Sequence, residues 1–270
     1  MANTIQKAAQ DQAVAERGGS DIKTLIRKMQ PAIQKALPSV ITPERFTRMV
    51  LTAISSTPKL AECDQLTFLA AMMNAAQLGL EPNTPLGQAY LIPFKNHGQM
   101  QVQFQLGYKG LIDLAYRSGD VVTVQAQVVY ENDTFECEFG IEPKLRHIPA
   151  EGDRGKPVKV YAMFRTKSGG YGFEVMSMED IRRHAEKYSQ SYSSSYSPWK
   201  TNFEEMAKKT VLKRCLKYAP LRSDVAAAIT GDGGIRHEIA PEMNDVPIEY
   251  IAAEAVEVSA ETETKENEKT

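Results

Sequence analysis

The sequence predicts an α+β protein, in which helices and antiparallel strands occupy separate stretches of the chain. Apolar residues recur at helical spacing over about residues 20–80, alternate as in strands from about 86 to 176, and return to helical spacing from residue 177. Two turn-forming tetrads, at residues 95–98 and 167–170, join neighbouring strand segments directly, which is typical of antiparallel pairing. The 42% hydrophobic content can build a core for such a fold.

The N-terminal part predicts a flexible arm followed by a helical group. Residues 1–19 are rich in Gln, Ala and charge, and they end in two glycines. Ser20 is the expected cap of a helix that reaches about residue 37, with a kink or break at Pro31. Two more helices are expected, one opening at residues 42–44 and one over residues 64–79. The second of these is apolar on nearly every face, which predicts that it is buried.

The middle of the chain predicts a central antiparallel sheet with a protruding hairpin. In the second hairpin strand Val102, Phe104 and Leu106 alternate with glutamines, so one face packs and the other stays polar. The hairpin strands are expected at residues 89–94 and 101–106, and further strands at 122–128, 135–139, 158–166 and 171–176.

The C-terminal part predicts helices over residues 177–188, 202–218 and 223–230, with a Ser/Tyr-rich loop after the first. From Gly231 the Gly, Pro and acid content predicts flexibility, with at most a transient helix near residues 248–258. The chain therefore divides into an arm (1–19), a folded core (20–230) and an acidic flexible tail (231–270).

Charge is distributed unevenly along the chain, although the net charge is only −2. Residues 231–270 hold 11 acidic and 3 basic side chains, a net of −8, which leaves residues 1–230 with 23 acidic and 29 basic side chains, a net of +6. A basic body with an acidic tail is common among proteins that bind nucleic acid, because the body attracts phosphates and the tail competes for the same surface.

Composition also limits the cellular setting. The longest uncharged run, Gln65 to Leu80, contains 16 residues, which is shorter than the roughly 20 residues of a membrane-spanning helix. The first twenty residues lack the apolar stretch of a secretory signal, and three scattered cysteines cannot form a disulfide framework. We therefore expect a cytoplasmic protein with reduced thiols and no membrane partner.

Motifs of common enzymes are missing from the sequence. The string nearest to a P-loop, Gly152 to Pro157, has the wrong spacing and a proline where a hydroxyl would bind Mg²⁺. No C-x-x-C, H-E-x-x-H or G-x-S-x-G string occurs. Glu136 and Glu138 share a strand face and are candidates for a metal-dependent nuclease, although alternating glutamates are common on solvated strands. We therefore expect no covalent catalysis.

The helix expected at residues 202–218 carries the first candidate nucleic-acid site. Lys209, Lys213 and Lys217 form one i, i+4, i+8 row, with Arg214 at its edge. Stacked cations repel one another, so the row costs stability unless an anion lies against it, and a phosphate backbone would supply that anion. The alternative is a solvated lysine face.

The second candidate site is the segment from Gly107 to Gly119, where a strand runs directly into a helix. Lys109 and Gly110 fall in the first turn, and a helix N-terminus with glycines and a lysine suits an anion. Arg117 continues the row from Lys109 through Asp113, so it either contacts phosphate or pairs with that aspartate.

Two aromatic residues next to lysines complete the candidates. Tyr108 lies beside Lys109 and Trp199 beside Lys200. Aromatic rings that stack on the bases of single-stranded nucleic acid contribute about 1 to 3 kcal/mol each. The alternative for Trp199 is an anchor that packs the last long helix onto the sheet.

Three long blocks carry a resemblance to a known family. They are QLGLEPNTPLGQAYLIPF (77–94), QLGYKGLIDLAYRSG (105–119) and PWKTNFEEMAKKTVLKRCLKY (198–218). In this order the blocks resemble the RecT family of phage single-strand DNA annealing proteins. The resemblance covers about residues 64–222, and three long blocks together are more specific than any short motif.

The resemblance implies an ATP-independent recombinase that assembles as a ring or helical filament on single-stranded DNA and anneals it to a complementary strand. It implies a phage exonuclease and the host single-strand-binding protein as partners, and Mg²⁺ as a modulator of DNA binding rather than a required cofactor. By position, the family's Y-[KR]-G-x-x-x-L-A-x-R and A-K-K-T-x-x-[KR]-R segments match Tyr108, Lys109, Gly110, Arg117, Lys208, Lys209, Lys213 and Arg214.

The sequence therefore predicts single-strand DNA annealing in phage-type homologous recombination, with residues 20–230 as the DNA-binding and oligomerisation core. A passive single-stranded DNA-binding protein, a Mg²⁺-dependent nuclease and a structural oligomer are the alternatives. We expect isolated monomers to bind DNA weakly, because a net charge of +6 gives each subunit a modest field. The candidate DNA-binding residues are Tyr108, Lys109, Gly110, Arg117, Trp199, Lys200, Lys209, Lys213, Arg214 and Lys217.

Overall fold

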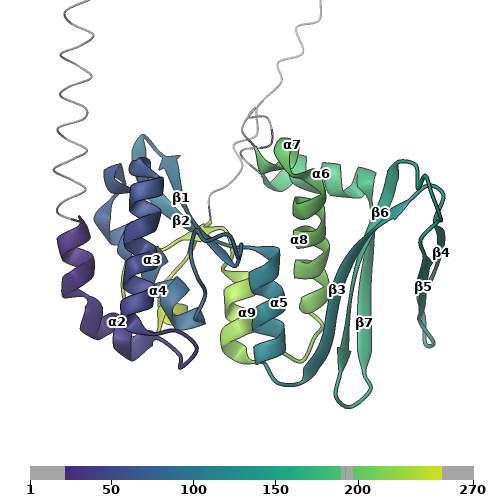
Figure 1. Ribbon diagram of the computed structural model, residues 1–270, viewed down its shortest axis with the longest axis horizontal. Helices are drawn as coiled ribbons and strands as arrows, with labels where there is room; N and C mark the ends of the chain where they lie inside the picture. Colours follow the sequence, from purple (N-terminus) through teal and green to yellow (C-terminus); the bar gives the residue numbers. More distant parts are fainter. Residues whose placement is uncertain (1–21, 190–191, 193–196, 251–270) are drawn as a thin grey trace, which may run out of the picture.

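The computed structural model describes residues 22–189, 192 and 197–250, and it has the expected α+β architecture (Figure 1). Helical residues 22–28 are followed by α2 (Gln30–Ala36), α3 (Pro43–Ser56), η1 (Pro58–Glu62), α4 (Gln65–Leu78), β1 (Ala89–Asn96), β2 (Gln99–Leu106), α5 (Tyr108–Arg117), β3 (Val121–Tyr130), β4 (Thr134–Glu138) and β5 (Lys144–Ile148). The chain continues with β6 (Pro157–Thr166), β7 (Tyr171–Ser177), α6 (Met178–Tyr188), α7 (Pro198–Thr201), α8 (Phe203–Leu216), α9 (Ser223–Thr230), β8 (Gly234–Ile235), η2 (Met243–Asp245) and β9 (Glu249–Tyr250). The predicted arm and the cap at Ser20 lie outside the described residues.

The N-terminal helices form where their caps and apolar spacing predict. The expected break falls at Met29, and Pro31 occupies the first turn of α2, where its missing N–H costs nothing. Asp64 caps α4 by accepting a hydrogen bond from the Thr67 N–H at 2.9 Å. Gly79 ends α4 at φ +59°, the left-handed geometry that glycine adopts freely. As predicted, nearly all of α4 is buried.

The hairpin predicted at residues 89–106 is present, but it packs against α4 rather than protruding. Its turn is the two-residue pair His97-Gly98, both at positive φ, so the strands extend further than the predicted tetrad allowed. The Val102 N–H donates to Thr67 Oγ1 at 3.1 Å and the Asp64 N–H donates to the Met100 carbonyl at 2.8 Å. The alternating apolar face of β2 therefore closes the N-terminal core.

Within the described residues, a three-stranded antiparallel sheet with the order β3-β6-β7 forms the other half of the molecule (Figure 1). Helix α8 packs against all three strands, and α5 lies between this sheet and the N-terminal helices, in contact with β3 and α8. Most of the buried apolar residues of both halves belong to one continuous core.

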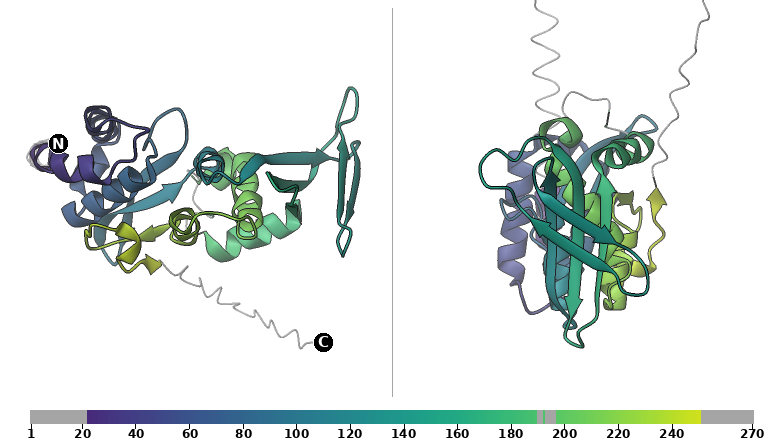
Figure 2. Two further views of the ribbon diagram at one scale, coloured as in Figure 1. Left: turned by 90° about the horizontal axis from the view of Figure 1, so that it is seen from below. Right: turned by 90° about the vertical axis from the view of Figure 1, so that its right-hand side faces the viewer.

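A two-stranded ribbon of β4 and β5 stands apart from that sheet (Figure 2). Strand β5 was missed in the sequence, because Lys144 to Ile148 is short and every second residue is charged or exposed. Glu136 lies opposite Arg146 and Glu138 opposite Lys144, with N–O distances of 3.9 and 3.7 Å. Each carboxylate that the nuclease alternative requires therefore faces a basic residue across the ribbon, in an exposed ion pair.

The predicted flexible tail begins inside the folded structure. Residues 231–250 form β8, η2 and β9, and Ile235, Met243 and Val246 are buried. The prediction placed this boundary too early because the segment is rich in Gly, Pro and acids, whereas its few apolar residues are the ones that reach the core. The rest of the tail, with most of the expected transient helix, lies outside the described residues.

Candidate nucleic-acid interface

Helix α8 is held by an apolar face that fixes the direction of its lysines. Ala207, Val211, Leu212 and Cys215 are buried against the sheet and α5. The same helical spacing turns Lys209 and Lys213 together toward another side. Burial of the apolar face therefore fixes the orientation of α8, and this orientation determines which groups lie next to Lys209 and Lys213.

The basic row meets a buried carboxylate of the same chain. Lys209 Nζ and Lys213 Nζ each lie 3.2 Å from Asp232 Oδ2, and the Asp232 side chain is only 5% exposed. The Leu106 N–H donates to Asp232 Oδ1 at 2.7 Å. The anion that this row requires is thus supplied within the fold, so the stability argument for a bound phosphate no longer holds for these two lysines.

The surroundings of Asp232 also shift its pKa. Burial raises the pKa of a carboxyl group, but here the two lysine ammonium groups and the Leu106 N–H outweigh it and hold the pKa of Asp232 below its ordinary value. The carboxylate is therefore charged near neutral pH and stays paired with both cations.

The remaining cations of α8 differ from one another. Arg214 Nε lies 2.6 Å from Glu174 Oε1 on β7, and Lys208 Nζ lies 3.2 Å from Glu205 Oε1 in the preceding turn. Lys217 caps the helix, is exposed, and has no ion-pair partner within the described residues. Of the α8 cations predicted to contact DNA, Lys217 is the one left without an acidic partner in the described part of the chain.

The first turn of α5 is built for close packing. A Cβ on Gly110 would lie 2.0 Å from the Gln88 carbonyl oxygen, so this position accepts only glycine for steric reasons. Tyr108 is half-buried, and burial together with the Glu205 carboxylate raises its pKa. Lys109, which lies between Tyr108 and Gly110 in the sequence, is exposed. Gly110 and Tyr108 thus have structural roles, while Lys109 presents its charge to solvent.

Arg117, at the end of α5, pairs with Asp113. Its Nη2 lies 2.8 Å from Asp113 Oδ2, and its side chain is 27% exposed. The geometry corresponds to the pairing alternative that the sequence left open. A phosphate contact at Arg117 would have to compete with this carboxylate.

Trp199 occupies the anchor position that the sequence offered as its alternative role. It is 7% exposed, and its ring packs edge-to-face on Phe203 with 5.9 Å between centroids. Ser197 caps the short α7 helix by accepting from the Trp199 N–H at 3.3 Å. The tryptophan therefore has no free face for stacking on a base in this conformation, whereas Lys200 beside it is exposed.

The structure brings part of the predicted site together. Helices α5 and α8 are in contact, and Tyr108 of the first lies near Glu205 of the second. Sequence reasoning missed Asp232, because its segment reads as flexible and no local spacing links it to α8. Among the described residues no group of three or more His, Cys, Asp or Glu side chains is placed to hold a metal ion. No described helix is both long and apolar enough to cross a membrane.

Comparison with known proteins places the chain in a family. The model of the RecT family matches residues 44–247. The chain is 40% identical to Protein RecT of Escherichia coli (strain K12) over 234 residues, which covers 84% of this chain and 86% of that protein. It is 28% identical over 248 residues to the uncharacterized protein YqaK of Bacillus subtilis (strain 168), covering 88% and 80% of the two chains.

The matched range runs from the start of α3 to η2 and so includes both halves of the fold and the Asp232 segment. The family match thus defines a single-stranded DNA annealing protein of phage-type recombination. The chain belongs to the RecT family. The resemblance stated from the three sequence blocks is confirmed, and the match extends beyond them at both ends.

Proposed function

We propose that this protein anneals complementary DNA strands without ATP, as an oligomer assembled on single-stranded DNA. The observation that carries the proposal is the family match over residues 44–247. Two DNA strands repel each other through their phosphates, so a protein that neutralises one backbone and leaves the bases accessible lowers the barrier to pairing. Base pairing itself supplies the specificity, so the protein needs no covalent step and no sequence reading.

Exposed cations carry the DNA contact in this proposal. Lys109, Lys200, Lys217 and Arg214 have exposed side chains, although Arg214 also pairs with Glu174. Lys209, Lys213 and Arg117 are less exposed and pair with carboxylates of the chain. The second group joins the interface only where phosphate displaces those carboxylates. Because each subunit offers few exposed cations of this set, tight binding depends on many subunits sharing one strand.

The proposed setting follows the family. The protein acts in the cytoplasm of a bacterial host beside a phage exonuclease and the host single-strand-binding protein, as a ring or filament. It requires no cofactor, and Mg²⁺ modulates DNA binding by screening phosphate charge and competing with the lysines. Titration of Mg²⁺ into the protein–DNA complex should therefore weaken binding. The protein without Mg²⁺ should still anneal complementary strands.

The first experiment follows two complementary, fluorescently labelled oligonucleotides with and without protein, in the absence of ATP, while a gel monitors DNA length. Faster pairing with intact DNA is the expected result. Binding without faster pairing would instead define a passive single-stranded DNA-binding protein. Shortened DNA would identify a nuclease and reopen the question of Glu136 and Glu138.

A further inference from the structure

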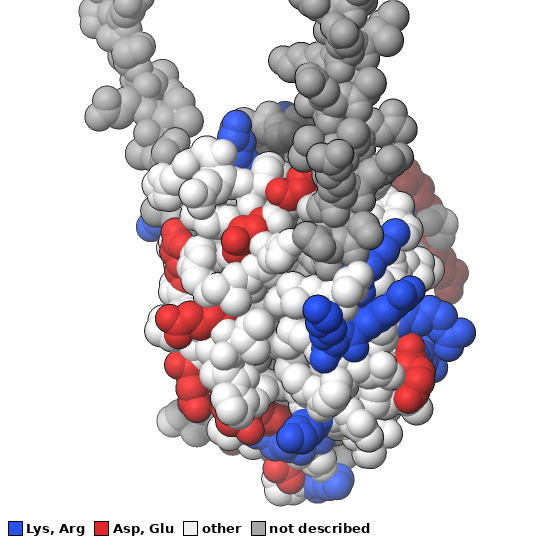
Figure 3. Space-filling model, turned by 90° about the vertical axis from the view of Figure 1, so that its left-hand side faces the viewer, with Lys and Arg blue, Asp and Glu red and all other residues white. Residues whose placement is uncertain are grey.

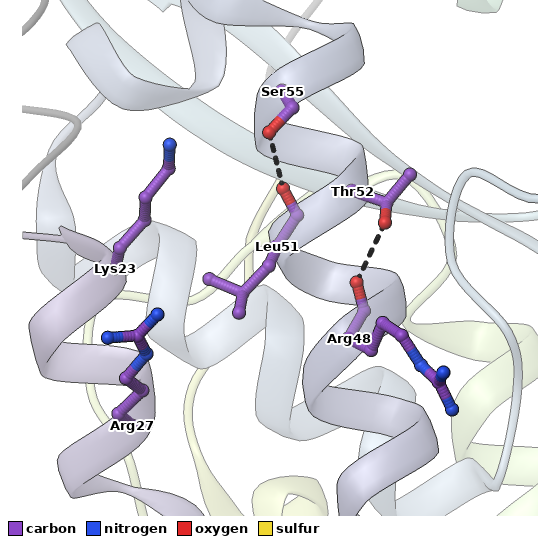
Figure 4. A pocket seen from close by; sticks show the side chains of 6 residues that line it. All are labelled: Lys23, Arg27, Arg48, Leu51, Thr52 and Ser55. Atoms are coloured by element: carbon purple, nitrogen blue, oxygen red, sulfur yellow. Dashed lines mark hydrogen bonds between the residues drawn. The ribbon is translucent and has the colours of Figure 1, made fainter.

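A basic pocket lies between the helical residues 22–28 and α3, far along the chain from the candidate interface. It is open to solvent, has a volume of about 310 Å³, and is lined by Lys23, Arg27, Arg48, Leu51, Thr52 and Ser55. Figure 4 shows Lys23 and Arg27 on one helix and Arg48 on the facing helix, with Leu51 between the two walls. No sequence motif pointed to Lys23, Arg27 or Arg48.

Packing of the two helices holds these cations at the surface. Ile22 and Ile26 are fully buried on the core side of residues 22–28, so Lys23 and Arg27, each one residue further on, are kept on the outer side. Phe46 and Val50 are fully buried on the core side of α3, so Arg48 lies on the exposed side of that helix. In Figure 4 the Arg27 guanidinium points into the space between the helices, while that of Arg48, which is exposed, turns outward.

The charges of the pocket have no acidic partner in the part of the chain that the structure describes. Within the described residues, no ion pair or side-chain hydrogen bond involves the Lys23, Arg27 or Arg48 side chain, in contrast to Lys209, Lys213 and Arg214. Lys23 and Arg27 are also an i, i+4 pair of like charge, which destabilises the helix unless an anion lies near them. On the face of the molecule shown in Figure 3, basic side chains gather in one area and acidic side chains lie mostly along another edge.

We infer that this pocket binds the phosphodiester backbone of single-stranded DNA, an inference that rests on the proposed annealing function. Guanidinium groups bind phosphate oxygens through paired N–H donors. Lys23 and Arg27 offer such cationic donors on one wall of the pocket, and Arg48 adds a guanidinium at the outer edge of the other wall. The open shape allows a polymer to pass through, which an enclosed pocket for a free anion would not. The Thr52 and Ser55 hydroxyls donate to the Arg48 and Leu51 carbonyls, so the three cations supply the donors.

The test compares three double variants of the full chain with the wild type. Arg27→Gln with Arg48→Gln removes two cations from the pocket, and Arg27→Lys with Arg48→Lys retains their charge. Lys35→Gln with Lys59→Gln removes two exposed cations that do not line the pocket, which makes it the matched control. All four positions are exposed, and thermal unfolding checks that each variant is folded.

The measurement is the salt dependence of oligonucleotide binding, with the annealing assay run in parallel. The pocket Gln variant should lose about 0.7 in the slope of log K against log salt for each lost contact, about 1.4 per protomer, while the Lys variant and the control keep the wild-type slope. A wild-type slope in the pocket Gln variant, with annealing intact in the wild type, would overturn the inference and leave the proposed function standing.

Three other outcomes also overturn it. Tighter DNA binding by the pocket Gln variant would show that the pocket holds an acidic protein segment that competes with DNA. Displacement of DNA from the wild type, but not from that variant, by low millimolar inorganic phosphate would identify a site for a free anion. Absence of DNA binding by the wild type would remove the proposed function, and this inference with it.

Discussion

Asp232 determines the electrostatic character of α8 although it is far from that helix in the sequence. Its carboxylate accepts from the Leu106 N–H, and it also lies 3.2 Å from both lysine ammonium groups, so it ties α8 to the end of β2. This carboxylate supplies the negative charge that the sequence analysis expected from a DNA phosphate. Lys209 and Lys213 therefore stabilise the folded protomer in the absence of DNA.

Replacing Asp232 with Ala should lower the free energy of unfolding by about 3 kcal/mol, because two partly buried ammonium groups and the Leu106 N–H lose their partner. Urea denaturation measures the change. Glu238→Ala removes an exposed carboxylate of the same segment and should change stability by less than about 0.5 kcal/mol. Equal stability of Asp232→Ala and the wild type would contradict a structural role for this carboxylate.

The low pKa of Asp232 adds a pH dependence with a definite sign. Since the folded-state pKa lies below the unfolded value of about 4, the contribution is complete above that value and is lost as pH falls through the folded-state pKa. Denaturation curves from pH 7 to pH 3 should therefore show wild-type stability falling toward that of Asp232→Asn. Parallel curves at all pH values would contradict the assignment.

At the scale of secondary-structure elements, the β4–β5 ribbon depends on one buried carboxylate at its base. The Asp133 side chain is fully buried, and it accepts from Arg154 Nη2 at 2.6 Å and from the Tyr130 and Ala150 N–H groups at 2.9 Å. His147 Nε2 of β5 lies 2.9 Å from the same side chain. These contacts join the end of β3 to β5 and to the connection before β6, so a two-stranded ribbon that is marginal alone becomes fixed to the sheet.

Asp133→Asn should loosen the ribbon while the rest of the fold persists. Hydrogen exchange of the amides in β4 and β5 should become at least about tenfold faster, since opening no longer breaks a charged network. Exchange in β6 and β7 should change little. Glu151→Gln, an exposed neighbour, is the control. Unchanged protection of β4 and β5 would show that their other contacts suffice.

The same carboxylate gives the ribbon a pH dependence. The hydrogen bond from Arg154, supported by those from Ala150, Tyr130 and His147, holds the pKa of Asp133 far below its ordinary range. Its contribution is therefore present above the unfolded pKa of about 4 and is lost only as pH falls well below that value. Ribbon amides of the wild type should stay protected down to about pH 4, when exchange rates are corrected for intrinsic pH dependence.

For the whole molecule, the boundary between fold and tail changes which truncation is informative. Cutting at Gly231 removes Asp232 and the buried Ile235, Met243 and Val246, so it damages the core. Cutting after Tyr250 leaves the described fold intact and removes 6 acidic and 2 basic side chains, a net charge of −4. Only the second cut tests the hypothesis that the tail tunes DNA release or recruits partners.

Removal of residues 251–270 should tighten binding to single-stranded DNA by roughly threefold to tenfold at low salt, because less negative charge competes for the basic surface. The difference should shrink as salt screens the charges. Fluorescence anisotropy across a salt series measures both effects. Replacing the six tail glutamates with glutamine keeps the length and should reproduce the result. Equal affinity of all three proteins would leave partner recruitment as the remaining role.

The sequence by itself determined the α+β class, the caps at Asp64 and Gly79, the hairpin and the family. These features are encoded by local spacing, by turn residues and by long blocks of sequence, and the family match bears out the last of them. Tertiary structure decided which charges are neutralised. Asp232 meets Lys209 and Lys213, and Asp133 meets Arg154, through chain paths that no periodicity encodes. A helical wheel gives the direction of a side chain from its own helix, whereas its partner depends on what the rest of the fold brings to that side.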